Sequence, residues 1–142
     1  MIFEDLEAWQ QARQLVNEIY SLTRQNNSLS KDFGLTGQVQ RAAVSIMSNV
    51  AEGFERTHLL EKMQFYNIAR GSTGEVRSLL YVISDNYPGS APKAERLRNT
   101  AVSVGKLVSG LLRSTEGRKV RLPRALSLVL APISYLLPSI FQ

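Results

Sequence analysis

The sequence predicts an all-α protein: an up-down-up-down four-helix bundle followed by a C-terminal tail whose order the sequence leaves open. Apolar residues recur every three or four positions in four stretches between residues 4 and 113, which is the period of helices with one buried face. Turn-forming residues separate these stretches, most clearly at residues 86–92, which hold two prolines and a glycine. Short links between helices of similar length favour antiparallel packing in a bundle.

The length and composition predict one domain without covalent staples. The chain has 142 residues, and we assign residues 1–114 to the bundle and residues 115–142 to a tail that is basic at first and apolar afterwards. There is no cysteine, which excludes disulfides, thiolate metal sites and cysteine nucleophiles and is compatible with a reducing cytosol. The acidic N-terminus does not resemble a signal peptide. We therefore expect a cytoplasmic protein.

The first helix is predicted over residues 4–25, with Asp5 as its N-cap. Trp9 lies on the apolar stripe of this helix, so we expect it to be a core anchor. Residues 25–28 have the composition of a loop.

The second helix is predicted over residues 35–55, and Asp32, Gly34 and Thr36 are alternative start signals. Beside its apolar stripe runs a second stripe of polar and mostly small residues, which is unusual for a face in contact with solvent. This stripe is either a semi-buried polar seam inside the bundle or a site for a ligand or partner.

The third helix is predicted over residues 57–85, with Thr57 as its cap. Gly71 and Gly74 lie near its middle, where each glycine costs about 1 kcal/mol relative to alanine. We expect another helix, the second one, to approach closely at these glycines. The two helices would then share a structural polar cluster of Arg41, Ser45, Asn49, Glu52, Ser72 and Glu75.

The fourth helix is predicted over residues 93–113. Its buried seam is expected to comprise Leu97, Ala101, Val104, Val108 and Leu111. The uncharged run at residues 125–142 contains Pro132 and Pro138 and is short for a membrane span, so we do not expect a membrane partner. Three interpretations of this run stay open. We favour docking on the bundle or on a neighbouring subunit. The alternatives are that the run lies on a membrane surface or that it is a mobile tail.

The positive charge is concentrated in the C-terminal part of the chain. Residues 1–86 carry 8 Lys and Arg against 10 Asp and Glu, a net charge of −2, whereas residues 87–142 carry 9 against 2, a net charge of +7. This asymmetry points to a polyanion or an anionic surface as partner, or to packing against acidic surface in an assembly.

One stretch, residues 41–53, reads Arg-Ala-Ala-Val-Ser-Ile-Met-Ser-Asn-Val-Ala-Glu-Gly. It resembles the signature of the four-helix-bundle family named for proteins encoded in 23S rRNA intervening sequences. Residues 3–12, 33–38, 65–72 and 105–111 add matches in the right order, so the resemblance extends to about Ser114. Met47 stands where the family often has proline, which predicts a straighter helix, and Gln40 replaces a common arginine.

The resemblance implies a homo-oligomer, a pentamer, that binds nucleic acid, because related bundle proteins that serve retroelement reverse transcriptases do both. The partner would be RNA or DNA, contacted through its phosphates. The candidate residues in this sequence are Arg96, Arg98, Lys106, Arg113, Arg118, Lys119, Arg121 and Arg124. No aromatic residues are interleaved with them, so we expect weak base stacking. The arginines at positions 41, 56, 70 and 77 are assigned to the fold or to subunit contacts. The alternative is a scaffold that binds a protein partner and no nucleic acid.

The sequence does not predict an enzyme. His58 is the only histidine, so a histidine-based triad or metal cluster has no second member, and no phosphate-binding glycine motif is present. We expect no catalytic residues, no metal and no cofactor. A hydrolase that uses Glu52 and Glu75 as a carboxylate pair is a third alternative.

Overall fold

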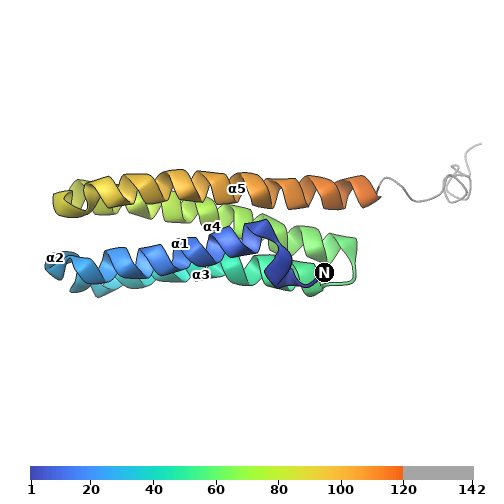
Figure 1. Cartoon of the computed structure of the whole chain (residues 1–142), viewed down its shortest axis with the longest axis horizontal. Coiled ribbons are helices and arrows are strands. Elements are labelled where there is room, and N and C mark those ends of the chain that lie inside the picture. Colours follow the sequence, from blue (N-terminus) through green and yellow to red (C-terminus); the bar gives the residue numbers. More distant parts are fainter. Residues whose placement is uncertain (120–142) are drawn as a thin grey trace, which may run out of the picture.

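The computed structural model describes residues 1–119, and its four long helices lie side by side as a bundle (Figure 1). The elements in chain order are the 3₁₀ turn η1 (Phe3–Asp5), α1 (Glu7–Gln25), α2 (Asn27–Ser30), α3 (Phe33–Glu55), α4 (Leu59–Asn86), the 3₁₀ turn η2 (Pro88–Ser90) and α5 (Ala91–Lys119). No strand occurs in this part of the chain. The predicted all-α bundle is confirmed.

Residues 120–142 are outside the described part, and the expectations for the apolar tail concern them. The last helix does not end at residue 113 as predicted: α5 continues to Lys119, and Thr115 is buried on it. Within the 119 described residues, no helix is both long and apolar enough to cross a lipid bilayer.

The core runs along the bundle axis and is made of aliphatic side chains from all four long helices. Leu15, Ile46, Leu80 and Leu97 are among its fully buried members. α4 packs along both α3 and α5, while α1 covers the remaining side against α3 and α5. On α5 the predicted seam is correct up to Val108, after which Leu112 is the buried residue. A straight helix has 3.6 residues per turn, so a strict alternation of three and four drifts off the core.

Three predicted helix ends are wrong, and local hydrogen bonds made by Asp5 and Asn26 account for two of them. Asp5 lies in η1, where its Oδ2 atom accepts a hydrogen bond from the Ile2 amide at 3.0 Å, and α1 begins after Leu6. α4 begins after His58, while Thr57 is exposed. The stretch predicted as a loop contains α2, which Asn26 caps by accepting hydrogen bonds from two backbone amides.

Of the three alternative starts of α3, the structure selects Asp32. Its Oδ1 atom accepts a hydrogen bond from the Leu35 amide at 3.1 Å. From there α3 runs without interruption past Met47, which agrees with the straighter helix expected there. Trp9 is half-buried and packs at the edge of the core, with the Phe3 ring at 5.2 Å between centroids.

The close helix approach predicted at Gly71 and Gly74 is wrong. Both residues are exposed, and a Cβ atom added at either one would meet nothing within 4 Å. Tight contacts occur instead at Gly53, where an added Cβ would lie 2.5 Å from Cε1 of Tyr66, and at Gly105, where it would lie 3.1 Å from Oγ1 of Thr73. The periodicity explains this result, since Ser72, Thr73 and Val76 form the buried face of α4.

Candidate nucleic-acid interface

Of the six residues predicted as a polar cluster, the structure links Ser45, Asn49 and Ser72 by hydrogen bonds, which connect α3 to α4. Asn49 Nδ2 donates to Ser45 Oγ at 3.1 Å, the hydroxyl groups of Ser45 and Ser72 are 2.9 Å apart, and Ser72 Oγ donates to the Ile68 carbonyl at 3.0 Å. Because the proton of Ser72 is used on that carbonyl, Ser45 is the donor between the two serines. The chain of bonds satisfies small polar groups between two helices, which supports the structural interpretation of this seam.

The charged members of that cluster, Arg41, Glu52 and Glu75, are exposed instead of buried in it. The contact between Ser45 and Ser72 fixes the register of these two helices. With a rise of 1.5 Å per residue, Glu52 and Glu75 then lie about 15 Å apart along the bundle. That separation does not allow the carboxylate pair on which the hydrolase alternative depends.

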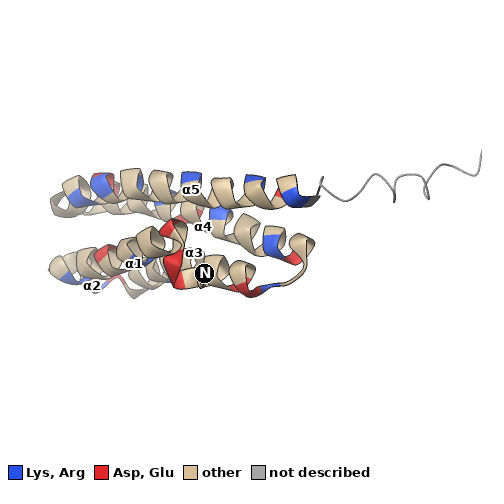
Figure 2. Ribbon diagram, turned by 45° about the vertical axis from the view of Figure 1, so that its right-hand side comes forward, with Lys and Arg blue, Asp and Glu red and all other residues tan. Residues whose placement is uncertain are grey.

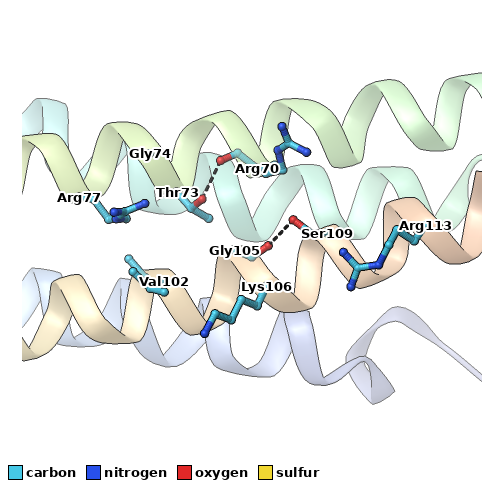
Figure 3. A pocket seen from close by; sticks show the side chains of 10 residues that line it. Arg70, Thr73, Gly74, Arg77, Val102, Gly105, Lys106, Ser109 and Arg113 are labelled. Carbon is cyan, nitrogen blue, oxygen red and sulfur yellow. Dashed lines mark hydrogen bonds between the residues drawn. The ribbon is translucent and has the colours of Figure 1, made fainter.

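A basic groove lies between α4 and α5, with a volume of about 440 Å³ (Figure 3). Four of its lining side chains are cationic, and none is acidic. The lining residues are Arg70, Thr73, Gly74, Arg77, Ala101, Val102, Gly105, Lys106, Ser109 and Arg113. We call this set the basic groove. All four cationic residues are exposed.

Small residues keep the floor of the basic groove open. An added Cβ at Gly105 would lie 3.1 Å from Thr73 Oγ1, so a larger residue there would displace that side chain, while a Cβ at Gly74 would meet nothing. The hydroxyl groups of Thr73 and Ser109 donate to the backbone carbonyls of Arg70 and Gly105 at 2.6 and 2.8 Å. The floor therefore needs no ligand to satisfy its donors.

The four cations follow one another along the axis of the groove, two on each helix. Arg70 and Arg77 are two helical turns apart on α4, and Lys106 and Arg113 have the same spacing on α5. The two helices are antiparallel, and the contact of Gly105 with Thr73 fixes their register. The order along the groove is then Arg77, Lys106, Arg70, Arg113, with α-carbons spread over about 18 Å. Figure 3 shows the same order.

Basic residues recur along α5 and α4, whereas acidic residues gather at the N-terminal turn (Figure 2). Like charges repel each other, and salt screens this repulsion poorly when the charges are closer than the Debye length. The Debye length is about 8 Å at physiological salt. The basic groove is therefore an electrostatic site for an anion that extends along the helices.

The structure separates the eight predicted nucleic-acid-binding residues. Lys106 and Arg113 line the basic groove, while Arg96 and Arg118 are exposed on α5 outside it. The side chain of Lys119 and all of Arg121 and Arg124 lie outside what the structure describes.

Arg98, another of the eight, is half-buried, and its guanidinium already makes hydrogen bonds within the protein. Its Nη1 atom donates to Ser84 Oγ at 2.8 Å and to the Leu80 carbonyl at 3.4 Å. Its guanidinium also lies over the ring of Tyr81, 4.1 Å from the centroid. Arg98 thus joins α5 to α4, and it does not offer a free charge in the way the prediction assumed.

Sequence reasoning missed Arg70 and Arg77, which it assigned to the fold or to subunit contacts. Both are exposed and line the basic groove. The available signal was their spacing of seven residues, which Lys106 and Arg113 repeat on the following helix. The equal spacing predicts a shared groove only when the register between α4 and α5 is known.

Burial, and then the nearby charge of Arg118, lowers the pKa of Lys62. Its ammonium group donates to the carbonyls of Phe54 and Gly53 at 2.6 and 3.2 Å. These carbonyls lie at the C-terminal end of α3, where a cation is favoured. Lys62 therefore serves the link between α3 and α4.

Among residues 1–119, no group of three or more His, Cys, Asp or Glu side chains is placed to hold a metal ion. His58 is exposed at the start of α4.

Comparison with known proteins agrees with this architecture. The family model described as 23S rRNA-intervening sequence protein matches residues 4–110, which include α1, α3, α4 and most of α5. A search of curated proteins finds no match to the chain.

Proposed function

Since the chain belongs to the 23S rRNA-intervening sequence protein family, we propose that it is a non-enzymatic, oligomeric protein of the cytoplasm that binds the phosphate backbone of RNA or DNA in the basic groove. The observation that carries this proposal is the row of Arg77, Lys106, Arg70 and Arg113 over a floor of small residues. Arginine and lysine are the side chains that most often contact nucleic-acid phosphates.

The lining of the basic groove is suited to the nucleic-acid backbone. It contains no acidic residue to repel phosphates and no aromatic residue on which a base could stack. We expect binding that depends on salt and is largely independent of sequence, as is usual for contacts made only to phosphates.

The test measures the affinity of a labelled RNA strand and a labelled DNA duplex by fluorescence anisotropy at low salt. The variant Arg77→Gln/Lys106→Gln removes two charges from the basic groove. The matched control, Arg24→Gln/Lys31→Gln, removes one arginine and one lysine that are exposed elsewhere. We expect the groove variant to lose at least tenfold in affinity, since each phosphate contact contributes to binding. An equal loss in both variants would assign the binding to net charge alone.

We also propose self-association, with five copies as the number that the family resemblance implies. Ile68 and Val82 on α4 and Val44 on α3 are large apolar residues that are 45%, 41% and 38% exposed in the single chain. Exposed apolar side chains are candidates for subunit contacts. Light scattering coupled to size-exclusion chromatography measures the mass directly, and a monomer would contradict the proposal.

The alternative function is a scaffold that binds a protein partner. The same exposed apolar residues favour it if they do not serve self-association. If Ile68→Ser has the same number of copies per assembly as the wild-type protein, and the wild-type protein binds neither RNA nor DNA at low salt, the scaffold becomes the better account.

A further inference from the structure

An exposed aromatic ring lies beyond one end of the basic groove. Tyr81 follows Arg77 by one turn on α4, so it lies about 6 Å further along the same helix. The spacing of residues 70, 74, 77 and 81 is four, three and four, which puts them on one face of α4. Tyr81 is 55% exposed. The row of cations therefore continues into an aromatic side chain.

Arg98 fixes this ring from the α5 side. The guanidinium lies 4.1 Å from the ring centroid, and it is itself held by Ser84 Oγ at 2.8 Å. A ring with a guanidinium on one side and more than half of its residue exposed still has surface for a second planar group. Since Arg98 already restrains the ring, stacking a ligand on Tyr81 loses little conformational entropy.

The sequence alone gave no sign of this arrangement, since aromatic residues are not interleaved with the basic residues of α5. Tyr81 and Arg98 are 17 positions apart and meet only because α4 and α5 are antiparallel neighbours. The expectation of weak base stacking was based on sequence order, and the structure supplies the aromatic residue from the adjacent helix.

We propose that the basic groove binds a single-stranded nucleic acid, with its phosphates along the cationic row and one unpaired base stacked on Tyr81. This inference rests on the proposed function and specifies the class of ligand. Bases inside a duplex are already paired and stacked, so only a single strand, a loop or a frayed end can offer a base to a protein ring. The groove lining itself has no aromatic residue, so stacking is confined to Tyr81, beyond the end of the groove at Arg77.

Stacking on an aromatic side chain is insensitive to which base is present, because every base has a π face. The site is therefore selective for strand state and not for sequence. It also has a polarity: the end of the groove at Arg113 has only charge, whereas the end at Arg77 has charge and a ring.

The test uses full-length protein with a short uridine-rich single strand of RNA and a blunt-ended RNA duplex of equal length. Tyr81→Ala is expected to weaken binding of the single strand about tenfold, a loss typical of one stacked base, and to leave duplex binding unchanged. Tyr81→Phe keeps the ring and is expected to bind the single strand like the wild-type protein. Neither change removes a charge, so the salt dependence is expected to stay the same.

The matched control is Tyr20→Ala on α1. Tyr20 also lies under an arginine, with Arg24 at 5.4 Å from its ring, but it is not part of α4 or α5. This control is expected to bind both RNAs normally, and circular dichroism checks that every variant is folded.

A second readout is the fluorescence of a 2-aminopurine base in the single strand, which is quenched when the base stacks. We expect quenching by the wild-type protein and by Tyr81→Phe but not by Tyr81→Ala. If Tyr81→Ala binds the single strand as the wild type does, or loses the same factor on the duplex, the inference is overturned while the proposed function stands. If the wild-type protein binds neither RNA, the proposed function fails and this inference fails with it.

Discussion

Asp32 connects two helix ends with one carboxylate. Its Oδ1 atom caps α3 through the Leu35 amide, and its Oδ2 atom accepts a hydrogen bond from the Tyr87 hydroxyl at 2.8 Å. Tyr87 follows the last residue of α4, so this bond joins the start of α3 to the end of α4. The hydrogen bond, followed by burial and the charge of Asp32, raises the pKa of Tyr87 above its ordinary value.

This raised pKa predicts a loss of stability at alkaline pH. The folded state holds the Tyr87 proton more tightly than the unfolded chain does. The contribution to the free energy of unfolding is therefore complete below the unfolded pKa of about 10 and is lost as the pH rises through the folded pKa. Urea denaturation between pH 8 and 11 is expected to show a steeper decline for the wild type than for Tyr87→Phe. Parallel declines would contradict this role of Tyr87.

The serine pair between α3 and α4 predicts different effects from two neighbouring substitutions. Ser72→Ala removes the acceptor of the Ser45 proton in a buried place, so we expect the free energy of unfolding to fall by about 1–2 kcal/mol. Glu75→Ala changes an exposed residue and is expected to stay within about 0.5 kcal/mol of the wild type. Denaturant titration of both variants measures this difference. A larger loss of unfolding free energy in Glu75→Ala would indicate that Glu75 does belong to the polar cluster.

At the scale of the element, α4 has glycines that are not explained by packing within residues 1–119. Gly71 has open space around it, so Gly71→Ala is expected to stabilise the helix by about 0.5–1 kcal/mol. Gly53→Ala on α3 is the contrasting variant, because its Cβ would collide with the Tyr66 ring, and we expect a lower melting temperature. If Gly71→Ala destabilises the protein instead, another chain packs against this face of α4.

At the scale of the whole molecule, the bundle was predictable and the groove was not. Hydrophobic periodicity locates Leu97, Ala101 and Val104 on a buried seam, because burial depends on spacing within one helix. The basic groove depends on the register between two helices, which no local pattern encodes. Arg70 and Arg77 were therefore assigned to other roles, although their positions in the sequence are plain.

Charge alone was also a poor guide to which basic residues are available. Arg98 is one of a run of basic residues near the start of α5, yet its guanidinium is bound to Ser84 and the Leu80 carbonyl. Helix ends were missed for a similar reason, since Asp5 and Thr57 are good caps by residue type but other residues occupy the capping positions. For Arg98 the deciding contact comes from tertiary packing, and for Asp5 it is the competing bond with the Ile2 amide.

The most direct test of the basic groove as a phosphate-binding site is the salt dependence of RNA binding. The logarithm of the association constant of a single strand falls with the logarithm of salt concentration by about 0.7 per neutralised phosphate. Four contacts predict a slope of about −2.8 for the wild type and about −1.4 for Arg77→Gln/Lys106→Gln. A slope that these two substitutions leave unchanged would show that the RNA lies elsewhere and would contradict the account.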